Sequence, residues 1–187
     1  MMRALVIVDV QPDFCPGGSL ATERGDHVAR LIGGFVDSDV AQATNYAAVV
    51  ATQDWHIDPG SHFSDEPDFV DSWPRHCVAH TEGAELHPAL RDVDFDALFK
   101  KGQYEAAYSG FEGTFEGESL AHWLRSSGIT AIDVAGIATD FCVRATVLDG
   151  LKENFEVRVL TGMCSAVDPQ RGDAALAEME AAGAQLI

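Results

Sequence analysis

The sequence predicts a three-layer α/β/α fold on a mostly parallel, doubly wound sheet. Short apolar runs alternate with amphipathic stretches along the chain, which is typical of parallel strands covered by helices. The first run, residues 4–10, is apolar at every position except Asp9, as expected for a strand buried on both faces. A length of 187 residues suits one core, so we expect a single domain over residues 1–187.

The remaining elements follow from local patterns. Strands are expected at residues 47–52, 95–101, 131–136, 157–161 and 184–187. Helices are expected at residues 26–43, 118–127, 140–152 and 169–182. The first has apolar positions at helical spacing, and the second is ended by Gly128. The third has Thr139 or Asp140 as its N-cap, and the fourth begins at Pro169. Residues 53–80 and 102–117 lack a period, and such long irregular segments usually carry function.

Composition excludes several classes of function. Twelve basic against 30 acidic residues give a formal net charge of −18, which disfavours nucleic acid and anionic lipid as partners. No apolar run is long enough to span a membrane, and the N-terminus lacks a signal-peptide pattern, so we expect a cytoplasmic protein. Four cysteines without C-x-x-C spacing do not predict a disulfide framework. A functional thiol among structural ones is the natural expectation.

Chemically capable residues follow the expected strands, at the sheet edge where such folds bind ligands. Cys142 lies at a predicted helix start, where free N–H groups and the helix dipole lower the pKa of a thiol. Asp9 ends the first strand and is placed to act as a general base. Lys101 or its neighbour Lys100 is placed to stabilise charge, and strand alternation alone does not choose between them. Each residue also has a structural reading: a buried small side chain, a capping aspartate or a strand-end lysine.

A second constellation lies in the irregular segment 53–80. Asp54 and His56 share a face of an extended chain, the Pro59-Gly60 turn brings His62 near, and His76 follows. One carboxylate and three imidazoles suit a divalent ion such as Zn, Fe(II) or Mn. The alternative is a polar loop with scattered histidines.

Taken together, these residues resemble the nicotinamidase/pyrazinamidase branch of the isochorismatase-like cysteine hydrolases. The matching stretches run in order through most of the chain: RALVIVDVQPDFC (3–15), DWHIDPGSHF (54–63), SWPRHCV (72–78), FKKG (99–102), YSGF (108–111) and GIATDFCV (136–143).

The resemblance implies an isochorismatase-like fold and a set of site residues. It makes Asp9, Lys101 and Cys142 the catalytic triad, with Lys101 chosen because the family lysine directly precedes the glycine. It implies metal ligation by Asp54, His56, His62 and His76, a substrate pocket walled by Phe14, Trp73 and Tyr108, and a cis peptide bond between Ile137 and Ala138. Two positions depart from the pattern: Phe141, where some relatives carry His, and Arg75, where a second Pro often follows Trp-Pro.

The implied reaction is hydrolysis of nicotinamide to nicotinate and ammonia, and of pyrazinamide to pyrazinoate, through a thioester on Cys142. The implied role is nicotinamide recycling for NAD synthesis, with a small amide as the partner molecule; monomer and homo-oligomer both stay open. Three rivals remain: cleavage of vinyl ethers or N-carbamoyl amides, as in other branches; a binding module, which the intact triad argues against; and a hydrolytic metal with a structural Cys142.

Overall fold

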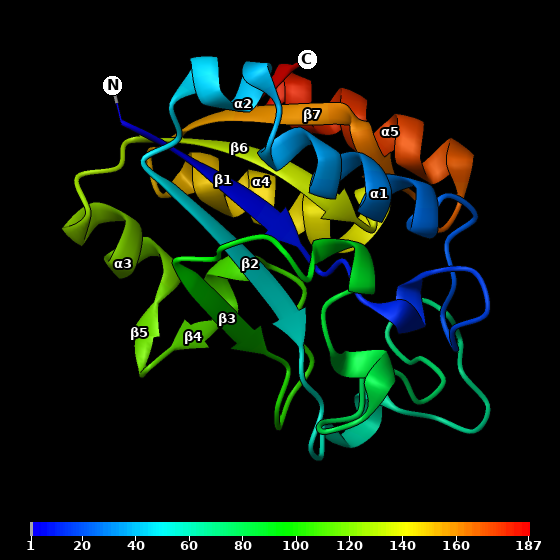
Figure 1. Cartoon of the computed structure of the whole chain (residues 1–187). Coiled ribbons are helices and arrows are strands. Elements are labelled where there is room, and N and C mark those ends of the chain that lie inside the picture. The colour runs from blue at the N-terminus through cyan, green and yellow to red at the C-terminus, as the bar shows by residue number, and fades with distance from the viewer. Residues whose placement is uncertain (1) are drawn as a thin grey trace.

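An eight-stranded sheet runs through the part of the chain that the computed structural model describes, residues 2–187 (Figure 1). Its strand order is β5-β4-β3-β2-β1-β6-β7-β8, and all neighbours are parallel except at the β3–β4–β5 edge. The strands are β1 (Arg3–Val8), β2 (Ala48–Asp54), β3 (Ala97–Lys101), β4 (Thr114–Phe115), β5 (Glu118–Ser119), β6 (Ala131–Ile137), β7 (Glu156–Ser165) and β8 (Gln185–Leu186). The predicted doubly wound, mostly parallel sheet is confirmed.

Five α-helices cover the sheet on both sides in the described residues: α1 (Gly25–Val36), α2 (Asp39–Thr44), α3 (Leu120–Ser126), α4 (Arg144–Lys152) and α5 (Pro169–Ala181). β1 shows how the layers form, because its residues from Ala4 to Val8 are fully buried. Val6 and its even-numbered neighbours pack in one cluster with α3, α4 and α5, whereas Leu5 and Ile7 pack with α1. Strand alternation therefore supplies two separate cores, one on each face.

The structure corrects several predicted boundaries. The expected helix at 26–43 is two helices, because Ser38 takes an extended backbone and its side chain caps α2 by accepting the Ala41 N–H. The expected helix at 140–152 begins as a π-helical turn, Thr139–Val143, before α4. Neither Thr139 nor Asp140 caps it; the Asp140 carboxylate instead accepts the N–H groups of Val167 and Asp168.

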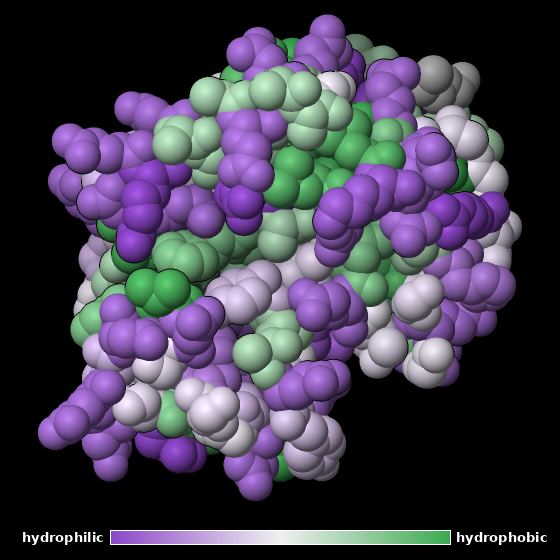
Figure 2. Space-filling model, turned by 180° about the vertical axis from the view of Figure 1, so that it is seen from behind, coloured by the Kyte–Doolittle hydropathy of each residue, from purple (hydrophilic) through white to green (hydrophobic). Residues whose placement is uncertain are grey.

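No helix within residues 2–187 is both long and apolar enough to cross a bilayer. On the face seen from behind, hydrophilic residues dominate the outer parts and hydrophobic residues gather in a band across the middle (Figure 2). All four cysteines, which lie within the described residues, are free thiols, as the sequence predicts.

The strand order reverses beside β1. The chain moves from β1 to β2 and β3 on one side, then returns to place β6 on the other side of β1. Ligands of doubly wound sheets bind at such a reversal, beyond the carboxyl ends of the strands. Asp9 follows β1 and Cys142 follows β6, so both lie at this reversal, with the ends of β2 and β3 alongside.

Candidate active site

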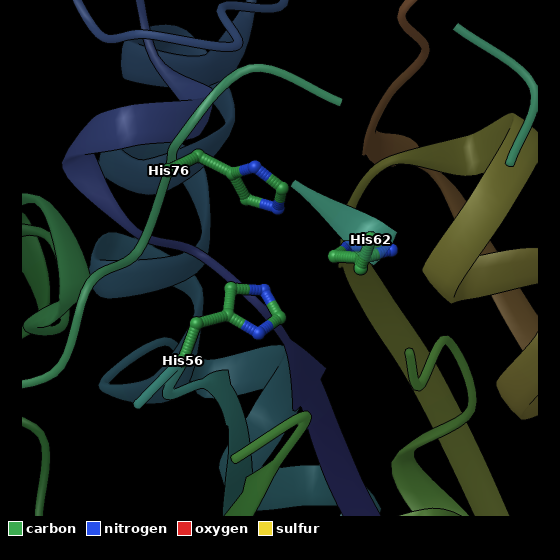
Figure 3. Close-up of side chains that lie close together, drawn as sticks. All are labelled: His56, His62 and His76. Atoms are coloured by element: carbon green, nitrogen blue, oxygen red, sulfur yellow. The ribbon is translucent and has the colours of Figure 1, made fainter. Parts of the chain in front are cut away.

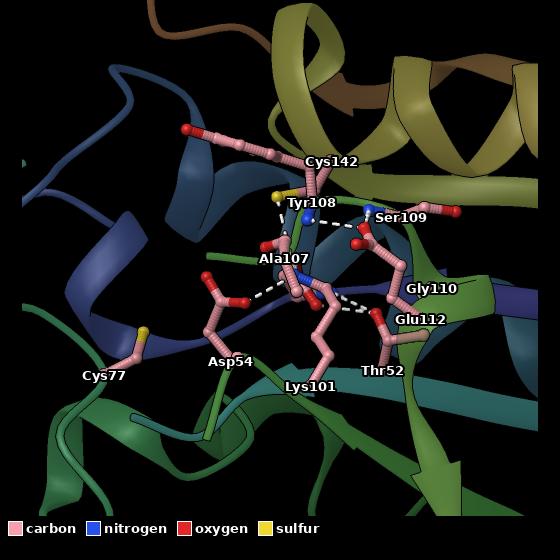
Figure 4. Close-up of polar contacts among 12 residues, drawn as sticks. Thr52, Asp54, Cys77, Lys101, Ala107, Tyr108, Ser109, Gly110, Glu112 and Cys142 are labelled. Atoms are coloured by element: carbon pink, nitrogen blue, oxygen red, sulfur yellow. Dashed lines mark hydrogen bonds and ion pairs between the residues drawn. The ribbon is translucent and has the colours of Figure 1, made fainter. Parts of the chain in front are cut away.

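The fold brings Asp9, Lys101 and Cys142 together in a buried cluster. Lys101 ends β3 with its side chain fully buried, and its Nζ lies 2.8 Å from Asp9 Oδ2 and 3.7 Å from Cys142 Sγ. Figure 4 shows Lys101 between Asp54 and Thr52, with Cys142 across from it. Lys100 points elsewhere, its Nζ lying 3.4 Å from the ring centroid of Trp55. The contacts therefore place Lys101, and not Lys100, in the cluster with Asp9 and Cys142.

The Asp9 carboxylate is oriented by the neighbouring strand. Thr52 Oγ1 donates a 2.6 Å hydrogen bond to Asp9 Oδ1. The backbone of Asp9 has a φ of 47°, as the chain turns away from the sheet directly after β1. Sequence reasoning did not select Thr52. This contact depends on the β1–β2 register, in which Val8 and Thr52 are partners next to Asp9, and no local pattern encodes that register.

Burial dominates the electrostatics of this cluster. Burial raises the pKa of Asp9, and it raises the pKa of the Cys142 thiol well above its usual range. In both cases the positive charge of Lys101 opposes the rise. Burial would lower the pKa of Lys101, but Asp54 and Asp9 outweigh it and keep the ammonium charged. The predicted lowering of the Cys142 pKa by a helix start is wrong for this cluster, because desolvation of the thiol outweighs it. An aspartate with a raised pKa is a stronger base for such a thiol.

Three imidazoles face one another beyond the end of β2 (Figure 3). The ring centroids of His56 and His76 are 4.9 Å apart, and those of His62 and His76 are 5.4 Å apart. Each ring offers a nitrogen within 4.8 Å of the others. Asp54 Oδ2 joins them, 3.6 Å from His56 Nε2 and 3.9 Å from His76 Nε2. The four residues expected as metal ligands therefore form one cluster.

Hydrogen bonds orient two of these rings for ligation. His56 Nδ1 lies 2.6 Å from the carbonyl of Gly102, and His76 Nδ1 lies 2.7 Å from the carbonyl of Pro74. A carbonyl only accepts, so both Nδ1 atoms carry a proton, and Nε2 is the nitrogen of each ring that faces Asp54. His56 Nε2 is buried without a hydrogen-bond partner in the described residues. Burial and the neighbouring histidines lower the pKa of His62 to about 4, which keeps it neutral at pH 7. A divalent cation fits this set of donors.

Gln11 holds Asp54 in place from the loop after β1. Its Nε2 donates to the backbone carbonyl of Asp54, and its Oε1 accepts the Asp54 N–H, both at 2.9 Å. The same amide donates to Ala84 O at 2.8 Å. Gln11 was interpreted only as part of a turn, and its supporting role depends on a contact with a distant strand end that local sequence does not reveal.

An apolar pocket opens onto Cys142 and the histidine cluster. Phe14, Trp73 and Tyr108, the three predicted wall residues, all line it, and Trp73 Nε1 donates to the Tyr108 hydroxyl at 3.0 Å. Phe141 also lines it, edge-on to Trp73 with ring centroids 4.9 Å apart. Sequence reasoning missed the lining side chains of Leu20, Ala107 and Val167, which come from segments without chemical signals. The Ile137–Ala138 peptide bond beside the pocket is cis.

The other departure from the family pattern lies away from the pocket lining. The Arg75 guanidinium stacks over the ring of Phe63, with its Cζ 5.1 Å from the centroid. Phe63 in turn packs edge-on to His56 and His76. Arg75 thus covers the outer side of the histidine cluster.

Comparison with known proteins assigns the family. Residues 3–187 match the model of the isochorismatase domain. The chain belongs to the isochorismatase family. It is 50% identical to the nicotinamidase/pyrazinamidase of Mycobacterium tuberculosis over 187 residues, covering all of this chain and 98% of that protein.

Solved structures of the family agree with this fold. The pyrazinamidase of Pyrococcus horikoshii in complex with zinc is 35% identical, with a TM-score of 0.82 over 100% of this chain and 99% of that one. The PnC1 protein of L. infantum in complex with nicotinate is 34% identical, with a TM-score of 0.85 over 100% of this chain and 92% of that one. The zinc-bound relative and the donor cluster of this isochorismatase-family chain support a divalent metal.

Proposed function

We propose that this protein is a metal-containing cysteine amidohydrolase that converts nicotinamide to nicotinate and ammonia, and pyrazinamide to pyrazinoate. The observation that carries the proposal is one pocket whose lining combines Cys142, aromatic walls and residues of the histidine cluster around the same space. Relatives named for both activities support the choice of substrate.

The first step is formation and attack of the thiolate. The Asp9 carboxylate, buried in the same cluster as Cys142, takes the Sγ proton and becomes neutral, and Lys101 stabilises the thiolate that this leaves. The thiolate attacks the carboxamide carbon. The N–H groups of Ala138 and Cys142 then hold the oxyanion; removing one such donor typically costs about 10²–10³ in rate.

The second half returns the free thiol. The protonated Asp9 gives its proton to the leaving nitrogen, and ammonia departs with formation of a thioester on Cys142. Asp9 then takes a proton from water, which attacks the thioester carbon. The C–S bond breaks, the thiol regains its proton and nicotinate is released.

The pocket residues position the aromatic ring. Phe14 and Trp73 pack against its faces, with Tyr108 held by its hydrogen bond from Trp73. Asp54, His56, His62 and His76 would hold the divalent ion (Zn, Fe(II) or Mn), which supplies a Lewis-acidic contact for the ring nitrogen. A ring held between Phe14 and Trp73 presents the carboxamide toward Cys142, which lines the same pocket.

The test is ammonia release from nicotinamide by purified protein supplied with Zn, Fe(II) or Mn after chelation. We expect metal-dependent release that disappears in Cys142→Ala and persists in the matched thiol control Cys15→Ala. Hydrolysis that survives in Cys142→Ala would overturn the thiol mechanism. Faster turnover of an N-carbamoyl amine than of nicotinamide would overturn the substrate assignment.

A further inference from the structure

A second cavity, of about 200 Å³, lies between the start of α1, the end of β7 and α5. None of its lining residues lines the pocket above Cys142. Two chain neighbours connect the cavities: Thr139 directly follows Ala138, and Ala166 directly precedes Val167. The proposed reaction makes no use of this second cavity.

Two residues that line this cavity carry hydroxyl groups without a protein partner. Thr139 and Ser165 are each only 4% exposed. Neither hydroxyl makes a hydrogen bond to another residue in the described chain, and neither oxygen is sealed from solvent, so both are free to bond a ligand. A polar ligand in the cavity would satisfy both.

Charges of both signs surround the same cavity without pairing with one another. Arg24, Glu23 and Asp173 line it and are exposed, and none of the three side chains makes an ion pair within residues 2–187. Arg24 and the buried thiol of Cys164 line the cavity together. One positive and two negative groups sum to −1, which disfavours a dianion such as a phosphate ester.

The remaining wall is aliphatic. Pro169, Ala166 and Leu176 line the cavity beside the polar groups. The second cavity therefore combines a guanidinium, two carboxylates and two unpaired hydroxyls with a small apolar surface.

We propose that this cavity binds a small aliphatic zwitterion of the amino-acid type. Its carboxylate pairs with Arg24, its ammonium group faces Glu23 and Asp173, and its polar atoms satisfy the hydroxyls of Thr139 and Ser165. The aliphatic part packs against Leu176 and Pro169. This site is separate from the proposed amidase chemistry and does not depend on it.

The test is calorimetric titration of the full-length, metal-loaded protein with three matched probes: L-valine, isovalerate, which lacks the amine, and isobutylamine, which lacks the carboxylate. We expect saturable binding of L-valine and at least about tenfold weaker binding of each analogue, since each loses a charge-assisted contact. Saturating nicotinamide should not displace L-valine. The proposal is overturned if L-valine produces no heat of binding and no rise in Tm. It is also overturned if either analogue binds as tightly as L-valine, or if nicotinamide displaces L-valine.

Variants locate the site. Arg24→Ala should weaken L-valine binding about tenfold or more, because Arg24 is the one cation lining the cavity. Ser165→Ala should weaken it by a smaller factor, and Arg30→Ala, an exposed arginine of α1 outside the cavity, should leave it unchanged. Unchanged affinity in Arg24→Ala overturns the proposal. Because the readout is binding rather than ammonia release, failure here is distinguishable from failure of the proposed function.

Discussion

Asp54 and Lys101 form a buried ion pair that joins the histidine cluster to the cluster around Cys142. The two residues are register partners at the ends of β2 and β3, so the sheet itself sets their approach. Oδ1 of Asp54 pairs with the lysine, while Oδ2 faces His56. Burial alone would raise the pKa of Asp54, but Lys101 and the contacts with His56 and His76 outweigh it and lower that pKa. Asp54 thus stays ionised and serves both clusters.

Replacing Lys101 should damage both catalysis and stability. Lys101→Met leaves the buried charges of Asp9 and Asp54 without their shared cation, so we expect a loss of about 3–5 kcal/mol in the free energy of unfolding. Catalytic rate should fall by about 10²–10³ or more. Urea unfolding and ammonia release measure the two effects, with the exposed Lys152→Met as control.

A double variant separates the two effects. Asp9→Asn combined with Lys101→Met removes one buried negative charge along with the cation, so it should recover part of the lost stability while activity stays absent. Full recovery of activity in the double variant would show that the Asp9–Lys101 pair is structural only.

Thr52 should matter for rate more than for folding. Thr52→Val keeps the shape of the side chain but removes the 2.6 Å hydrogen bond to Asp9 Oδ1. Losing a hydrogen bond to a charged group is worth roughly 1.5–3 kcal/mol, so kcat/KM should fall about 10- to 100-fold. Steady-state kinetics check this against the exposed Thr130→Val. Equal kinetics in the two variants would mean that Asp9 needs no such orientation.

Sequence was a good guide to the parts of this fold that local pattern controls. The continuous apolar run of β1 predicted a strand buried on both faces, and Ala4 to Val8 are fully buried. Asp9 and Cys142 were located because they follow such strands. Lys101 was distinguished from Lys100 only by resemblance, since both lie on one short strand and their environments depend on β2 and the histidine loop.

Features that depend on distant contacts could not be predicted. The break between α1 and α2 rests on a single extended residue, Ser38, which the helical spacing across residues 26–43 conceals. The pKa of Cys142 depends on how completely the sheet and loops exclude water, so reasoning from a helix start alone gave the wrong direction. Gln11 supports Asp54 across two strand ends, which no local pattern encodes.

Asp133 should make stability fall in acid. It is fully buried on β6 and accepts hydrogen bonds from Arg158 at 2.5 and 2.8 Å and from the Tyr46 hydroxyl at 2.6 Å. Burial alone would raise the pKa of Asp133, but these partners and Arg3 outweigh it and lower that pKa below its ordinary value of 3.8. Between the folded and unfolded pKa values the unfolded chain binds more protons, so stability increases with pH there.

The stabilisation by Asp133 is therefore complete above pH 3.8 and disappears as pH falls through the folded pKa. Asp133→Asn should destabilise the protein by about 3 kcal/mol at pH 7, and its difference from the unmodified protein should shrink below pH 3.8. Urea unfolding at a series of pH values measures this. The exposed loop variant Asp92→Asn should differ little from the unmodified protein at any pH. A difference for Asp133→Asn that stays constant into acid would contradict the assignment.

Removing the metal should lower both stability and activity, because the histidine cluster binds it only in the folded chain. His56 Nε2 and His62 Nδ1 are buried without hydrogen-bond partners in the described residues, so an ion that recruits these rings relieves an unfavourable arrangement. Because the metal binds only the folded state, Tm should rise with metal concentration. The free energy of unfolding should increase by about 2.7 kcal/mol when the metal is at 100 times its Kd. Chelation should reverse the rise. His62→Ala should abolish most of this stabilisation and lower the bound metal below one ion per chain. His27→Ala, at an exposed histidine of α1 that belongs to no candidate metal group, should keep both. Thermal unfolding and elemental analysis measure the two effects, and an undiminished metal content in His62→Ala would remove His62 from the ligand set.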